Sequence, residues 1–212
     1  MIDPEMLGLL WSTPVGTALM LRVGGLGLLI MGLRMWRAGL WVATLGGALA
    51  IWSFSHVGHV TGQDAPFLDV ALNLHLAALA LWIGILTPLR RLARDPETHA
   101  RAAFVGHRFG LVAMGVIPVL LIAGGYLAYT LVGSFSALLG TSYGQVIILK
   151  LLCVAGLLEL GAANKRRFVP ALRAGEVKAA KQLSRTILIE WMMVVAILGV
   201  TAVLTTGLTL PV

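Results

Sequence analysis

Three histidines, placed at the end of one apolar run and inside the next, are the side chains best suited to chemistry. His56 and His59 stand three positions apart in FSHVGHV, and His75 lies in the following run. Positions i and i+3 share a helical face, and a short loop makes successive helices antiparallel neighbours. We therefore expect the three imidazoles to lie at similar depth, where they could bind copper, zinc or haem iron.

Two other side chains could complete such a site. Met20, in the first apolar run, offers a soft thioether, and Asp69, at the start of the third run, offers a carboxylate. Imidazole and thioether donors together suit copper. A structural role stays open for the histidines, because interfacial side chains with polar tips anchor helix ends and polar groups inside a membrane hydrogen-bond between helices.

The composition of the chain indicates whether these residues belong to a soluble protein or to a membrane protein. Of the 212 residues, 58% are hydrophobic and only 12% are charged, with a mean hydropathy of +0.92. A typical soluble domain has about 25% charged residues, so the composition indicates an integral membrane protein. The single cysteine, Cys153, excludes an intrachain disulfide and a cysteine metal cage. No nucleophile elbow or P-loop occurs, so we expect no enzymatic activity.

Six stretches are long and apolar enough to cross a bilayer, which takes about 20 helical residues. Lipid offers the backbone no hydrogen-bond partners and the runs lack alternation, so helices are favoured over a barrel. We predict an all-α polytopic membrane helix bundle, a single transmembrane domain over residues 1–212 with six transmembrane helices. The helices are expected near 15–33, 39–58, 68–89, 109–132, 145–163 and 187–208.

Basic residues gather in alternate loops, between helices one and two, three and four, and five and six. The positive-inside rule places these loops in the cytoplasm and both termini on the outer side. The net charge of +7 is thereby explained by the lipid bilayer, with no nucleic-acid partner. The N-terminal segment lacks a basic region and a cleavage site, so we do not expect a signal peptide.

Two cations inside predicted spans occur at matching positions of an internal repeat. The stretch STPVGTALMLR (12–22) aligns with GTSYGQVIILK (140–150), which pairs Thr13 with Thr141 and Arg22 with Lys150. Such similarity is typical of duplicated membrane folds. Each cation is expected ~10 Å beyond its helix entrance. It could extend outward to lipid headgroups, but the repetition favours a functional role or a buried ion pair.

Two acids also fall inside predicted spans. Glu159 and Glu190 lie in the inner halves of the fifth and sixth spans, near the basic residues of the loop that joins them. We expect cytoplasmic ion pairs. A proton or ion relay is the alternative, because ionisable groups within a membrane are costly and usually functional.

Short motifs in a fixed order resemble the copper resistance protein D family, CopD, over about 150 residues. They are GH (58–59), Asp69, HLAALALWIG (75–84), RFG (108–110), SYGQVIILK (142–150), AANKRRFVPAL (162–172) and LSRTILIEW (183–191). Carried over position by position, the family pattern covers His59, Asp69, His75, Trp82, Gly84, Arg108, Tyr143, Gly144, Lys150, Asn164, Pro170 and Glu190. His56 is not assigned by it.

The resemblance implies a multi-pass protein of the bacterial inner membrane that serves copper homeostasis and moves copper inward. It also implies a periplasmic CopC-like copper-binding partner. Relatives are similar but usually longer at the N-terminus by two helices, so this chain is expected to begin within the first repeat, and a homodimer could supply the missing route.

The leading hypothesis is therefore a periplasm-facing copper site formed by the histidines with Met20 or Asp69. Paired histidines on neighbouring helices also hold haem b in electron-transfer proteins, which is one alternative. The other alternative is a copper chaperone or scaffold for cuproenzyme assembly that does not transport the ion.

Overall fold

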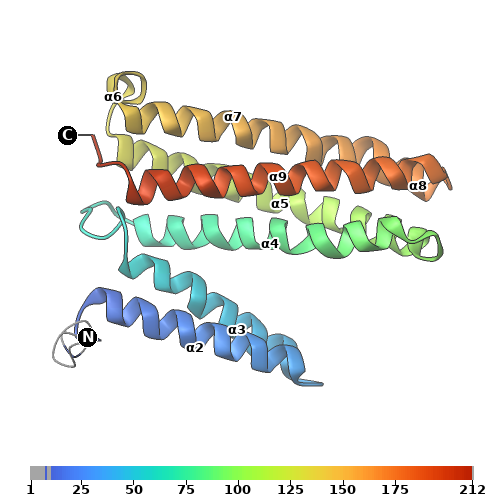
Figure 1. Ribbon diagram of the computed structural model, residues 1–212, viewed down its shortest axis with the longest axis horizontal. Coiled ribbons are helices and arrows are strands. Elements are labelled where there is room, and N and C mark those ends of the chain that lie inside the picture. The colour runs from blue at the N-terminus through green and yellow to red at the C-terminus, as the bar shows by residue number, and fades with distance from the viewer. Residues whose placement is uncertain (1–7, 9–10, 212) are drawn as a thin grey trace, which may run out of the picture. The chain divides into compact units, whose positions relative to one another are not determined.

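The computed structural model describes residues 8 and 11–211, and the elements of this part are all helical (Figure 1). In chain order they are α2 (Pro14–Arg34), α3 (Gly39–Trp52), η1 (Ser53–His56), α4 (Leu68–Arg94), η2 (Pro96–Thr98), α5 (His99–Val132), α6 (Phe135–Gly140), α7 (Ser142–Ala163), η3 (Asn164–Phe168), α8 (Val169–Arg173) and α9 (Val177–Thr206). The element η1 is a 3₁₀ turn and η3 is a π-helical turn.

Five helical segments among the described residues are long and apolar enough to cross a membrane. The predicted all-α polytopic membrane fold is thereby confirmed, and five of the six predicted spans overlap these segments. The five segments are Pro14–Arg34, Leu68–Arg94, Pro96–Val132, Ser142–Arg173 and Val177–Thr206.

The segment predicted as a span at 39–58 is shorter than the others. Its helix α3 has 14 residues, hence about 21 Å at 1.5 Å per residue, and the chain then tightens into η1. At this transition the Ser53 hydroxyl donates to the carbonyl oxygen of Ala50 at 2.6 Å. Such a local bond competes with the regular helix pattern and accompanies the change of winding.

The chain divides into two compact units, which are described separately. The first unit comprises Met1–Ala77 and Ala123–Leu131, and the second comprises Ala78–Ile122 and Val132–Val212. The prediction of one transmembrane domain over the whole chain stays a prediction.

In the first unit, α2 and α3 form an antiparallel hairpin with close backbone contact (Figure 1). A Cβ atom added at Gly25 would lie 2.6 Å from the Gly46 carbonyl oxygen and 2.7 Å from the Ala50 nitrogen. Small residues permit such an approach, which replaces the hydrophobic effect as the source of helix association in lipid. A second contact in this unit packs Leu68 and Ala71 of α4 against Leu127 of α5.

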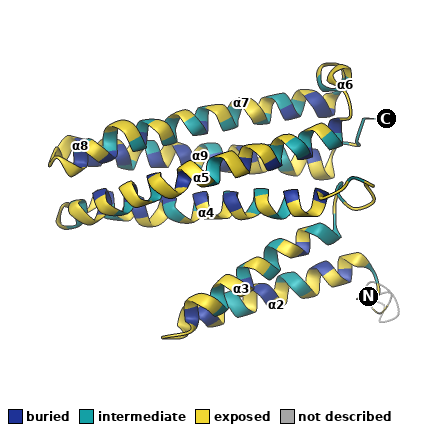
Figure 2. Cartoon of the chain, turned by 180° about the vertical axis from the view of Figure 1, so that it is seen from behind, coloured by how far each residue is buried: buried dark blue, intermediate teal, exposed yellow. Residues whose placement is uncertain are grey.

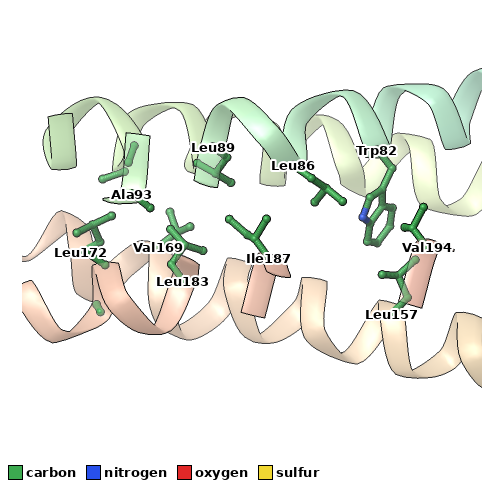
Figure 3. Close-up of a cluster of buried hydrophobic side chains, with 14 of the residues drawn as sticks. Trp82, Leu86, Leu89, Ala93, Leu157, Val169, Leu172, Leu183, Ile187 and Val194 are labelled. Atoms are coloured by element: carbon green, nitrogen blue, oxygen red, sulfur yellow. The ribbon is translucent and has the colours of Figure 1, made fainter. Parts of the chain in front are cut away.

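The second unit has a core of apolar side chains from α4, α5, α7, α8 and α9. Figure 3 shows Leu86 and Leu89 of α4 pointing toward Ile187 of α9, with the Trp82 indole at one end of the cluster. On α9 the buried positions Leu183, Ile187, Glu190, Val194 and Ile197 follow the three- and four-residue spacing of one helical face. Exposed residues cover the remaining faces of the helices (Figure 2), and many are large and apolar, as expected for contact with lipid.

Candidate functional site

The predicted histidines lie on two segments of the first unit that a side-chain hydrogen bond joins. His56 ends η1, His59 lies in the turn that follows, and His75 lies on α4; all three are partly buried. The Asn73 side chain of α4 donates to the Ser55 hydroxyl of η1 at 2.7 Å. Because Ser55 precedes His56 and Asn73 is two residues before His75, the two histidine-bearing segments are held side by side.

His56 carries a buried nitrogen with an unsatisfied hydrogen-bonding capacity. Its Nδ1 atom is buried and has no hydrogen-bond partner, while the ring meets Trp52 edge-on with centroids 6.5 Å apart. An unpaired polar atom in such a position is costly and calls for an explanation. An imidazole nitrogen with a free lone pair is also the form that ligates metal ions.

His75 packs directly on the backbone of α5, within the same unit. A Cβ atom added at Gly124 would lie 2.8 Å from the Cε1 atom of His75 and 2.9 Å from its Nδ1 atom. Only glycine leaves room for the ring in this position. Gly124 therefore fixes where the imidazole lies, and sequence reasoning did not identify it, because it is one of many glycines in an apolar run.

The Arg22 side chain makes two contacts with the segment that carries His56. Its Nε atom donates to the Ser53 hydroxyl at 3.1 Å, and its guanidinium carbon lies 4.4 Å from the centroid of the Phe54 ring. Ser53 is fully buried. The Nη2 atom of Arg22 is buried without a hydrogen-bond partner. Arg22 is thus held inside the unit by hydrogen bonding and a cation–π contact, and Ser53 was missed as its partner.

The other two proposed donors, Met20 and Asp69, are exposed side chains. Met20 is 54% exposed, and Asp69 is exposed on the first turn of α4. Among the residues that the structure describes, no three His, Cys, Asp or Glu side chains are grouped so that they could hold a metal ion. The histidine site therefore stays a prediction, and an ion bound there would have to draw its ligands together.

The internal repeat is visible in the starts of two helices. Thr13 caps α2 by accepting from the Gly16 amide at 3.4 Å, and Thr141 caps α7 by accepting from the Gly144 amide at 3.1 Å. Both helices begin one residue after the threonine. The cap fixes the start of each helix, so Arg22 and Lys150 occupy the same helical position. Lys150 is partly buried.

The second unit contains a buried polar cluster around Glu190, which is only 2% exposed. The Asn164 side-chain amide donates to its Oε1 atom in a short hydrogen bond, and the Trp82 indole donates to its Oε2 atom at 3.4 Å. Thr186 completes the cluster by donating to the Asn164 side-chain oxygen at 2.5 Å. Residues from α4, η3 and α9 thus meet at one carboxyl group.

The expected ion pairs of the two intramembrane acids are not observed. Glu190 is bound by the neutral side chains of Trp82 and Asn164, because the register of α9 turns it toward the core. Glu159 is exposed on α7. Neither acid forms an ion pair within the described part of the chain. Trp82, Asn164 and Glu190 all belong to the motifs of the resemblance, whereas Thr186 was missed.

A cavity of about 200 Å³ lies beside the Glu190 cluster. Glu190, Trp82 and Asn164 line it together with the basic residues Lys165 and Arg166 of the π-helical turn, and the rest of its lining is largely apolar. Gly161 lets α7 approach this place, since a Cβ atom there would lie 2.9 Å from the Trp82 ring. The buried carboxyl group of Glu190 thus lines the same cavity as the cationic side chains of Lys165 and Arg166.

Apolar helices of spanning length with ionisable groups held between them define a multi-pass α-helical membrane protein. Residues 103–204 match the model of the family described as copper resistance protein D. The chain is thus a multi-pass membrane protein that resembles the copper resistance protein D (CopD) family over this part, which runs from α5 to α9. It includes Lys150, Asn164 and Glu190 but not the three histidines.

Two curated relatives are similar over most of the chain. Inner membrane protein YebZ of Escherichia coli (strain K12) is 29% identical over 164 residues, which cover 71% of this chain and 53% of YebZ. Copper transport protein CutJ of Bacillus subtilis (strain 168) is 28% identical over 153 residues, covering 70% of this chain and 27% of CutJ. The match thus spans about half the length of YebZ and about a quarter of CutJ. No solved structure matches the chain.

Proposed function

We propose that the protein binds copper through His56, His59 and His75 and carries it across the bacterial inner membrane as part of copper homeostasis. The match of residues 103–204 to the CopD family model supports a role with copper. The relatives add to this, because one is named an inner membrane protein and the other a copper transport protein. In this proposal copper is the cargo, and the chain acts as a carrier rather than as an enzyme.

The observation that carries the proposal is the buried, unpaired Nδ1 atom of His56, on a segment tied to the helix of His75. A nitrogen lone pair in this position gives an incoming ion its first strong ligand. His59, His75, Met20 or Asp69 would then complete the coordination. Because these donors are not already grouped among the described residues, part of the binding free energy of the ion is used to rearrange them. The affinity is lowered by this amount, which favours exchangeable binding over storage.

Copper loading of the detergent-purified protein tests the site. We expect stoichiometric copper in the wild type and a marked loss in His56→Ala and in the double variant His59→Ala/His75→Ala. His107→Ala is the matched control, because His107 is exposed on α5 and lies on the predicted cytoplasmic side. Equal copper in all four proteins, or a haem Soret band in the purified wild type, would contradict the proposal.

Transport is a separate claim and needs a separate measurement. Proteoliposomes that contain the protein should accumulate copper, and the histidine variants should not. Copper bound at the histidines without any flux would instead establish the chaperone or scaffold alternative. A periplasmic CopC-like donor and a second copy of the chain are the proposed partners. Flux that rises when a copper-loaded CopC-like protein is added would support the first of them.

A further inference from the structure

Glu190 is a buried carboxyl group whose hydrogen bonds, among the described residues, come from neutral donors. The side chain is 2% exposed and takes one hydrogen bond at each oxygen, from Asn164 and from Trp82. Burial of an ionised carboxylate without a compensating charge is strongly unfavourable. The two neutral donors offset part of this cost, and the remainder must be removed by a proton or a bound cation.

The side chains around this carboxyl group come from three helical elements and the lining of the adjoining cavity. Trp82 faces it from α4 and Asn164 from η3, while α9 contributes Thr186 and apolar neighbours. Lys165 and Arg166 line the adjoining cavity, but neither forms an ion pair with Glu190 in the described part of the chain. They are basic residues of the loop predicted to face the cytoplasm, so the cavity leads from the carboxyl group toward that side.

A metal ion fits this place poorly. The Asn164 side chain already has partners at both ends, since its nitrogen donates to Glu190 and its oxygen accepts from Thr186. The Trp82 indole is a donor and has no lone pair to offer. Among the described residues that line the cavity, Glu190 supplies the only carboxylate and Met114 the only thioether, whereas bound metal ions usually need four or more ligands. A proton needs only one oxygen and a path for water.

We propose that Glu190 is an intramembrane proton-binding site that is loaded through the cavity beside Lys165 and Arg166. The cavity of about 200 Å³ has room for several water molecules. In the loading step a hydronium ion transfers its proton to the carboxylate, which leaves a neutral carboxylic acid and one water molecule. The Oε2 atom is the acceptor, because its bond from Trp82, at 3.4 Å, is the longer and weaker of the two.

The use of this proton rests on the proposed function. A copper cation that crosses the membrane carries positive charge, and a proton that moves in the opposite direction would balance part of that charge. Glu190 would exchange its proton with the cytoplasmic side while the histidine region handles the metal. The proton site can be tested without any assumption about copper.

Infrared difference spectroscopy on the purified full chain tests the proton site directly. A pH titration should reveal the C=O stretching band of a buried carboxylic acid in the wild type. The band should be lost in Glu190→Gln and kept in Glu159→Gln, a matched control because Glu159 is a span carboxyl group that is exposed. A band that survives in Glu190→Gln, or no titrating band in the wild type, would overturn the assignment.

A second variant covers the case in which Glu190→Gln does not fold. Asn164→Leu keeps the carboxyl group and removes the donor to Oε1, which is the carbonyl oxygen once Oε2 is protonated, so the band should remain and move to higher frequency. An unmoved band would refute the assignment.

Coupling is measured with proteoliposomes and an internal pH dye. A copper gradient should drive opposing proton movement in the wild type and in Glu159→Gln, and Glu190→Gln should lose it while still binding copper. Unchanged proton movement in Glu190→Gln would refute the coupling. Absence of copper binding in the wild type would refute the proposed function alone, because the infrared band is scored independently.

Discussion

The substitution Gly124→Ala should weaken copper binding without unfolding the protein, because it adds one methyl group directly against His75. The new Cβ atom would lie 2.8 Å from the Cε1 atom of the imidazole, whereas carbon atoms pack at about 3.5 Å or more. The ring must therefore move by roughly 0.7 Å. Metal–ligand distances hold to roughly 0.2 Å, so the added methyl group restricts the positions that the imidazole can take when the ion draws its ligands together.

The expected loss in copper affinity is about 10- to 100-fold, the range found when a residue that orients a ligand is replaced. Stability should change little. Rotating His75 off its preferred torsion costs about 0.5–1.5 kcal/mol, and replacing glycine by alanine within a helix returns about 0.5–1 kcal/mol. The measurement is a competition titration of the purified protein with a chromogenic copper chelator, accompanied by a thermal melt.

Gly125→Ala is the matched control for this experiment. It adds the same methyl group one residue further along α5, where nothing lies within 4 Å of the new Cβ atom. Equal copper affinity of the two variants would show that the position of His75 does not matter for the metal. The role of His75 as a ligand would then have to be abandoned.

Three further predictions concern helix packing, helix capping and the pH dependence of copper affinity. Gly25→Ala should destabilise the α2–α3 hairpin by a few kcal/mol and lower the melting temperature, since rigid backbone atoms block the new methyl group. Gly24→Ala is the control, because the space around Gly24 is open, and it should not lower the melting temperature. Thr141→Val should cost about 1 kcal/mol of stability by removing the cap of α7, measured by chemical unfolding in detergent; no change would mean that the cap is not needed. Copper affinity should fall as the pH is lowered, because protonated imidazole cannot ligate, and a pH-independent affinity would argue against histidine ligands.

Most of the fold could be predicted because length and hydropathy determine a membrane helix directly. Five of the expected spans are present, and the repeat at Thr13 and Thr141 extends to the geometry of the two caps. The segment 39–58 departs from the prediction. Its hydropathy does not show that Ser53 bonds to the turn before it and ends the regular helix early.

The candidate sites were predictable only in part, because hydropathy does not show which side chains face one another. Glu190 was expected to pair with loop cations, but its spacing from Ile187 and Val194 on α9 already placed it on the buried face. Its bonds to Trp82 and Asn164 join positions far apart in the chain. No single-sequence pattern reports such contacts.

The partners of Arg22 give a reason why copper binding at His56 should be reversible. Arg22 is fixed by Ser53 and Phe54, which lie three and two residues before His56 in the same short segment. A fixed positive charge next to a metal site raises the free energy of a bound cation. The hydrogen bond to Ser53 and the contact with Phe54 hold the guanidinium group in this position. The proposed function is that of a carrier, which must release the ion that it binds, and a fixed cation beside the proposed site favours release over retention.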